Sequence, residues 1–399
     1  MDIGFGEAVL IFGGLLTVVA ALSGVMRGTV LSASVLSVAL GVLLAAVGAI
    51  DVKPRSQAIV ELVELALILT LFSDGMFVER DLLARHWSPV ARALVIAMPI
   101  TMLLLGLVAK GLFPDLSWAE ALLLAAVLSP TDPVVTSAVV TSKLVPASVR
   151  HTLNLESGLN DGLALPFVLF FLVLATPGGD AGTEAAKLLG EALFGAAVGV
   201  GLGMLGGRLH RYLPGGGMTA RYEGIYAVGI ALFAFGLADV TIGNGLIAAF
   251  VCGIAMAASE REVPAGFVEF AENASAILQV LTFFVFGALI VATGFHHSVP
   301  PLVLFVLFAL LLARPLAVLL SFAKTGIPRP QKLFMAWFGP KGVASMLFAL
   351  FVLKSDVADS NLIFDIAAIT IIASIAAHGL TDTVGAQWLA RRVGLDRPH

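Results

Sequence analysis

The chain has 399 residues, of which 59% are hydrophobic and only 13% are charged, and its mean hydropathy is +1.01. Soluble globular proteins carry about 25% charged residues, so this composition excludes a water-soluble fold and indicates a protein whose solvent is lipid. The formal net charge of −4 does not suggest a nucleic-acid partner. The single cysteine excludes an internal disulfide and gives no basis for a cysteine-ligated metal site.

Apolar segments long enough to cross a bilayer follow one another along the whole chain. Because a transmembrane helix needs about 20 mostly apolar residues, we predict an all-α polytopic membrane protein with about 13 transmembrane helices and no soluble domain. The expected spans are 5–25, 29–50, 57–75, 87–112, 117–141, 148–176, 185–212, 221–238, 243–259, 266–294, 299–324, 328–355 and 362–390.

Lysine and arginine residues are distributed unevenly between alternate loops. If the N-terminus lies outside, the inner connections and the C-terminal tail hold 16 of the 23 basic residues, and the outer connections hold five. Membrane proteins carry their excess of basic residues on the cytoplasmic side. The pattern therefore predicts an N-out, C-in topology, which requires an odd number of spans.

Two of the expected spans are interrupted by proline and glycine. The interruptions are SPTDP at 129–133 and GPKG at 339–342. Thr131 lies 44 residues after the start of segment 87–176, and Pro340 lies 41 residues after the start of segment 299–390. The two interrupted spans run in opposite directions in the predicted topology. Since many transporters contain inverted repeats with such broken spans, we predict that these segments are inverted three-helix repeats that form the core of the protein.

The sixth expected span has the highest density of polar and ionisable side chains at lipid depth, in the sequence ESGLND at 156–161. Side chains four residues apart share a helix face, so Ser157 and Asp161 form one column. Glu156 and Asn160 form the adjacent column. Ionisable groups inside a membrane are costly and mark functional sites.

A dehydrated monovalent cation needs oxygen ligands, and this region supplies several. Asp161 and Ser157 offer a carboxylate and a hydroxyl, and the broken fifth span adds the Thr131 hydroxyl and carbonyls that are freed by Pro133. Because burial disfavours a charged carboxylate, protons compete with cations for it. We therefore predict that Asp161 binds either a cation or a proton, with Thr131 and Ser157 as further metal ligands. The alternative for Asp161 is a polar side chain that only holds helices together.

A second buried acid beside Asp161 needs a positive partner to stay charged. Arg314, in the sequence LLLARPLAV, is the only arginine deep in an expected span. We predict a buried salt bridge between Arg314 and Glu156, with direct cation binding by Glu156 as the alternative.

Two other charged residues lie at the interruptions. Lys341 is expected to offset the negative carbonyl ends of two half-helices. Asp132 is expected to offset positive helix ends in the fifth span or to bind Asn160. For Asp74 we expect a polar role at the cytoplasmic edge, and for His378 a hydrogen-bonded position near a span end, with pH sensing as the alternative.

The motifs SPTDPV at 129–134, ESGLNDG at 156–162, ARPLAV at 313–318 and FGPKGVAS at 338–345 resemble those of the electroneutral sodium/proton exchangers in the monovalent cation/proton antiporter superfamily. The resemblance keeps the order of the motifs over nearly the whole chain. It is strongest to the bacterial NhaP-like group, which is related to the animal NHE exchangers.

The resemblance implies an NhaA-like antiporter fold in the bacterial inner membrane and a homodimer. Segments 5–75 and 185–294 would be mainly dimerisation and scaffold helices, against which the core moves like an elevator. It also implies that Asp161 binds the cation and the proton alternately, while Asn160 and Asp132 hold the crossing helices.

The family pattern also bears on charge. It matches Glu156 to a buried acid and Arg314 to its partner. Electrogenic relatives carry Asp-Asp where this chain has Asn160 before its aspartate, which predicts one proton exchanged per cation. Lys341 stands where the family usually has arginine, which leaves its effect on coupling open.

A sodium-coupled solute symporter with similar inverted repeats is the main alternative. Such a carrier would need polar residues from both crossing helices, whereas the twelfth span supplies Lys341 and Ser345 but no acid. An intramembrane enzyme lacks a second catalytic aspartate or a serine–histidine pair at one depth. We therefore expect no enzymatic activity and no cofactor, with Na⁺ favoured over Li⁺ and K⁺ as the transported cation.

Overall fold

A computed structural model of the chain describes residues 5–26, 33–53, 56–76, 87–132, 142–177, 181–212, 220–259, 265–294 and 298–395. Regular structure in these residues is entirely helical, as predicted. Seven of the helices are long and apolar enough to cross a membrane, and five shorter apolar helices of 10–17 residues accompany them among the described residues. The total of 13 spans and the N-out orientation stay predictions.

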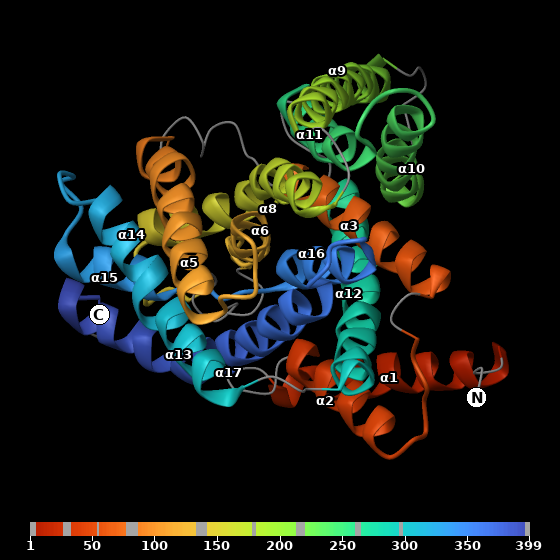
Figure 1. The fold of residues 1–399 in the computed structure, drawn as a ribbon. Helices are drawn as coiled ribbons and strands as arrows, with labels where there is room; N and C mark the ends of the chain where they lie inside the picture. The colour runs from red at the N-terminus through yellow and green to blue at the C-terminus, as the bar shows by residue number, and fades with distance from the viewer. Residues whose placement is uncertain are drawn as a thin grey trace.

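The helices follow the expected spans closely along the chain. They are α1 (Phe5–Met26), α2 (Ala33–Ala46), α3 (Gln57–Met76), the π-helical turn η1 (Ala93–Ala97), α5 (Met98–Leu112), α6 (Trp118–Val127), α8 (Ala147–Ala175), α9 (Ala181–Tyr212), α10 (Ala220–Asp239), α11 (Gly245–Ser259), α12 (Ala265–Thr293), α13 (Val299–Phe308), the π-helical turn η3 (Ala309–Ala313), α14 (Arg314–Ser321), α15 (Arg329–Trp337), α16 (Val343–Lys354) and α17 (Ser360–Val393). In Figure 1, α9, α10 and α11 form one group, while α5, α13, α14 and α15 lie on the other side of the molecule, and α6, α8 and α16 lie between the two groups.

Both expected interruptions lie at helix ends in the structure. The twelfth span consists of two short helices, α15 and α16, joined by the non-helical residues 338–342. In the fifth span, α6 ends at Val127 and is followed by non-helical residues up to Asp132. The rest of this expected span, residues 133–141, lies outside the described residues.

A π-helical turn precedes a proline in the first helix of each segment that we predict to be a repeat. η1 is followed by Pro99, and η3 is followed by Pro315. Proline has no N–H to donate and its ring crowds the preceding turn, so the helix widens for one turn before it. The division of the chain into two inverted repeats and a scaffold stays a prediction, to which this shared feature lends support.

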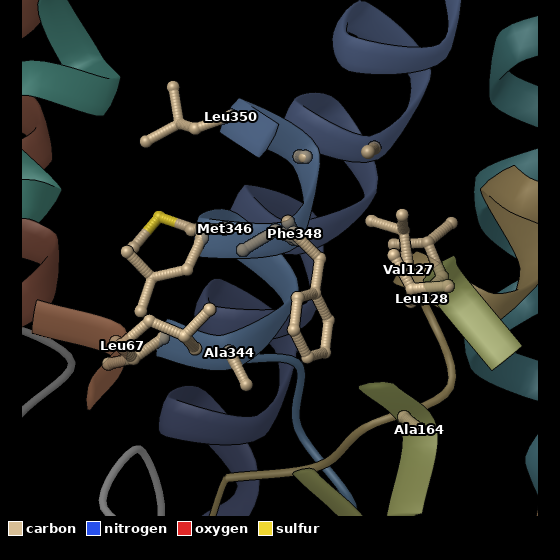
Figure 2. Close-up of a cluster of buried hydrophobic side chains, with 14 of the residues drawn as sticks. Leu67, Val127, Leu128, Ala164, Ala344, Met346, Phe348 and Leu350 are labelled. Carbon is tan, nitrogen blue, oxygen red and sulfur yellow. The ribbon is translucent and has the colours of Figure 1, made fainter. Parts of the chain in front are cut away.

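Apolar packing surrounds the two interrupted helices. Figure 2 shows Leu67 of α3, Val127 and Leu128 at the end of α6, and Phe348 of α16 in one buried cluster. These side chains are at most 1% exposed. The cluster fixes the positions of the helix ends from which the polar residues project.

Helices α3 and α11 approach so closely that their backbones touch. A Cβ atom at Gly253 of α11 would lie 2.2 Å from the Phe72 carbonyl oxygen of α3, and one at Gly75 would lie 2.5 Å from the Phe250 carbonyl oxygen. Membrane helices use small residues in this way to pack backbone against backbone. The contact holds the end of α3, which carries Asp74, against the centre of the protein.

We predict that Gly253→Ala lowers the stability of the protein by about 1–3 kcal/mol, because the added methyl group must separate two rigid backbones. The matched control is Gly229→Ala in α10, where a Cβ atom would have nothing within 4 Å. Thermal unfolding of the purified protein in detergent measures both variants. Equal melting temperatures would contradict the close approach of α3 and α11.

Candidate functional site

The candidate site lies where the non-helical segment that follows α6 in the fifth span meets the middle of α8. Thr131 comes from the non-helical segment, and Ser157, Asn160 and Asp161 come from α8. All four side chains are buried, with exposures between 2% and 6%. The predicted ligands are therefore gathered in one place by two segments that are separate in sequence.

Hydrogen bonds hold Thr131 against α8. Asn160 Nδ2 donates to the Thr131 hydroxyl at 2.7 Å, and the Ser157 hydroxyl donates to the Thr131 carbonyl oxygen at 2.5 Å. The two hydroxyl oxygens are 3.3 Å apart. Asn160 thus orients a ligand residue, and its neutral amide can donate this bond, which a carboxylate could not.

A second carboxyl group, from Asp74, faces Asp161. The two side chains lie close enough to share a hydrogen bond when one of them is protonated. Helix α3 comes this close because α8 has Gly158 at the contact, where a Cβ atom would lie 3.3 Å from the Asp74 carbonyl oxygen. Our sequence interpretation placed Asp74 at the cytoplasmic edge, and the structure instead places it at the candidate site.

Three oxygen atoms at this place are buried and have no hydrogen-bond partner within the described part of the chain. They are Asp161 Oδ1, Asn160 Oδ1 and Asp74 Oδ2. Buried polar atoms are nearly always satisfied, so an unsatisfied group of acceptors needs an explanation. A cation satisfies acceptor oxygens, and carboxylate, amide and hydroxyl oxygens are the ligands that hard cations prefer.

Charged side chains compensate the helix ends where the two interruptions cross. Lys341 Nζ donates to the carbonyl oxygens of Pro130 at 3.3 Å and Ser129 at 3.5 Å. Asp132 Oδ2 accepts a bond of 3.2 Å from the backbone N–H of Val343, the first residue of α16. A cation at carbonyls and an anion at a helix N-terminus both complement the helix dipoles. Asp132 therefore acts on the N-terminus of α16, while the part of the fifth span that follows Asp132, for which we expected a similar role, lies outside the described residues.

The crossing is a direct backbone contact. The Asp132 N–H donates to the Pro340 carbonyl oxygen at 2.9 Å. A Cβ atom at Gly342 would lie 2.1 Å from Asp132 Cβ, so only glycine fits there. Lys341 lies close enough to Asp161 for its positive charge to act on that carboxyl group.

Glu156 of α8 and Arg314 of α14 form a buried ion pair. Arg314 Nη1 is 2.7 Å from Glu156 Oε1, and both side chains are at most 10% exposed. Arg314 Nη2 also donates to the carbonyl oxygens of Met335 at 3.4 Å and Phe338 at 3.5 Å, at the C-terminal end of α15. The guanidinium therefore binds a buried acid and a helix end at once.

The chain matches one family model over most of its length. The family is described as "Sodium/hydrogen exchanger, transmembrane", and the match covers residues 14–385. This match favours exchange over the symporter alternative.

Proteins of known name and structure are similar to this chain. The K(+)/H(+) antiporter NhaP of Alkalimonas amylolytica is 27% identical over 82% of this chain and 57% of its own length. A probable Na(+)/H(+) antiporter of Schizosaccharomyces pombe is 30% identical over 73% of this chain and 40% of its own length. This chain thus spans about half the length of these curated relatives. The sodium proton antiporter MjNhaP1 of Methanocaldococcus jannaschii has the same fold, with a TM-score of 0.77 at 21% identity over 96% of this chain and 98% of that one.

We predict that Arg314→Ala destabilises the protein by about 3–5 kcal/mol, because it leaves the Glu156 carboxylate buried without its partner. Thermal unfolding and the yield of folded protein measure this loss. The double variant Glu156→Gln with Arg314→Met should recover much of the stability, because it removes both charges. A stable Arg314→Ala protein with an altered cation affinity would instead show that the pair belongs to the binding site.

Proposed function

This chain belongs to the sodium/hydrogen exchanger family, and from that premise we propose that it exchanges Na⁺, or Li⁺ or K⁺, for H⁺ across a membrane at Asp161. The observation that carries the proposal is the group of buried, unsatisfied oxygens on Asp161, Asn160 and Asp74 beside a broken helix. A site that contains only hydrogen-bond acceptors can be satisfied in two ways. A cation can bind the acceptors, or protons can convert carboxylates into hydrogen-bond donors.

Competition between these two occupants is the proposed mechanism. When the carboxyl pair of Asp161 and Asp74 is protonated, the acids satisfy each other through a shared hydrogen bond. When a cation binds, it takes ligands from Asp161, from Thr131 and Ser157, and from Asp74. Because the same oxygens serve both occupants, the site holds either the proton or the cation, and this is the minimal requirement of an antiporter.

We propose that one proton is exchanged for one cation, so that the cycle moves no net charge. Two facing carboxylates in a buried site cannot both be charged without a compensating cation. One arriving cation then displaces one proton, and the charge of the site stays constant. The neutral Asn160, where electrogenic relatives have an acid, supports this count, and Asp74 makes the exchanging unit a pair of acids instead of a single carboxylate.

The wider cycle is proposed from the family. The protein would be a homodimer in the bacterial inner membrane, in which segments 87–176 and 299–390 form a moving core. Segments 5–75 and 185–294 would form the dimerisation and scaffold part. The contacts of Lys341 and Asp132 tie the two interrupted helices together, so the crossing would move as one body when access alternates.

We predict that Asp161→Asn abolishes exchange, because an amide cannot release a proton to make room for a cation. In proteoliposomes with an imposed pH gradient, the native protein should dissipate the gradient when Na⁺, Li⁺ or K⁺ is added, and the order of the three ions gives its preference. The matched control is Asp365→Asn, a buried carboxylate in α17 that accepts a hydrogen bond from Thr293 away from the site. Full exchange by Asp161→Asn would overturn the proposed site.

We also predict that an imposed membrane potential leaves the exchange rate unchanged. The same proteoliposomes, with the potential set by a gradient of the permeant anion thiocyanate in potassium-free buffer during Na⁺/H⁺ exchange, measure this dependence. A potential that drives Na⁺ uptake would contradict the one-for-one cycle. In that case both carboxyl groups of the pair would have to release their protons, and Asp74→Asn should restore independence from the potential.

A further inference from the structure

The interruption between α15 and α16 removes a particular hydrogen bond. In an unbroken helix, each N–H donates to the carbonyl oxygen four residues earlier, so the N–H of Lys341 would bind the carbonyl of Trp337. In this chain residues 338–342 are not helical, and both groups are at lipid depth in the predicted topology. A backbone group without a partner costs several kcal/mol there, on the order of the desolvation penalty of an amide.

Two side chains from α17 bind these two backbone groups, of which the Trp337 carbonyl oxygen also accepts a bond of 2.9 Å from the Gly339 N–H. The Lys341 N–H donates to Ser374 Oγ at 2.9 Å, and His378 Nε2 lies 2.9 Å from the Trp337 carbonyl oxygen. Ser374 and His378 are four residues apart and so project from one face of α17. They are 0% and 2% exposed.

The histidine ring connects the two halves of this arrangement. Each ring nitrogen faces a carbonyl oxygen, and a neutral imidazole carries a proton on only one of its two nitrogens. Nδ1 lies 3.2 Å from Ser374 Oγ and 2.7 Å from the Ser374 carbonyl oxygen. With the proton on Nε2, this nitrogen donates to the Trp337 carbonyl oxygen and Nδ1 accepts from the Ser374 hydroxyl, so that this tautomer joins Ser374 to Trp337.

The ring is also fixed by packing. Trp337 stacks on His378 with ring centroids 5.0 Å apart, and the Trp337 indole N–H donates to Thr381 Oγ1 at 2.9 Å. The end of α15 is thus held on α17 by two side-chain hydrogen bonds and one stacked pair.

We propose that Ser374 and His378 form a bridge in place of the missing helical hydrogen bond, and that His378 is a positioning residue for the cation site. The bridge fixes the backbone at Lys341. Lys341 Nζ in turn holds the carbonyls of Ser129 and Pro130, and the next residue is the proposed ligand Thr131. Loss of the bridge therefore displaces a ligand of the cation, although neither Ser374 nor His378 touches it. The link to transport rests on the proposed function, whereas the bridge itself does not.

His378→Leu keeps the bulk of the side chain and removes both ring nitrogens, while His378→Gln keeps a donor and an acceptor. In proteoliposomes we expect His378→Leu to raise the half-saturating cation concentration about tenfold, the effect of one lost hydrogen bond. The maximal rate should change by less than about threefold, because the lost hydrogen bond weakens the positioning of a cation ligand and leaves the exchanging carboxyl groups in place. His378→Gln should return the half-saturating concentration to the native value. Thr381→Val, one turn further along α17, is the control, because it removes the bond from the Trp337 indole N–H and keeps both hydrogen bonds that Ser374 and His378 make to the backbone.

Hydrogen–deuterium exchange of the native protein and the variants, followed by mass spectrometry of peptides that cover 338–342, tests the bridge without transport. This segment should exchange faster in His378→Leu and Ser374→Ala, and as slowly as in the native protein in His378→Gln and Thr381→Val. Unchanged exchange in His378→Leu, or equal behaviour of the Leu and Gln variants, overturns the bridge. A lower melting temperature with an unchanged half-saturating concentration overturns the positioning role. If the native protein exchanges no cation for protons, the proposed function fails, and the hydrogen exchange still decides on the bridge.

Discussion

Two helices that stop inside the membrane leave backbone N–H and C=O groups that lipid cannot satisfy, and the centre of this protein is organised around those groups. The three open ends that lie in the described part of the chain have partners from other segments. Lys341 donates to carbonyl oxygens of the segment that follows α6, and Arg314 donates to carbonyl oxygens at the end of α15. Asp132 accepts from an N–H at the start of α16. The charged residues that look anomalous in an apolar sequence are therefore those that the interrupted backbone requires.

This arrangement also bears on the proposed cation site. The interruptions place backbone dipoles, hydroxyl groups and carboxyl groups together, while Arg314 is paired with Glu156 and Asp132 accepts from the N-terminus of α16. Asp161 and Asp74 are left as the acids that face each other. In the proposed cycle, the charge that changes would therefore be that of this one pair of carboxyl groups.

Rigid packing keeps this pair in place. Glycines allow α3 to contact α11 and α8 at backbone distance, and the apolar cluster of Figure 2 locks the ends of α6 and α16. On α17, Ser374 and His378 hold the other interrupted helix. The proposed site is thus held by several helices that supply none of its proposed ligands.

The sequence by itself determined the membrane class, the helical content and the places of both interruptions, and it named Thr131, Ser157, Asn160 and Asp161 as the candidates that the structure brings together. These follow from local composition and from side chains that share one helix face, and such information is carried by short stretches of chain. The pairing of Glu156 with Arg314 could also be proposed, because a buried acid needs a cation and few were available.

Only the tertiary structure decided which distant groups meet. Asp74 and His378 each looked like a polar residue near the end of a span, since hydropathy reports depth and says nothing about which helix lies opposite. Packing of α3 on α8 brought Asp74 to Asp161, and packing of α17 on α15 brought His378 to Trp337. The contact of Asp132 with the start of α16 could not be predicted for the same reason, since the sequence does not show which helix end lies beside a charged side chain.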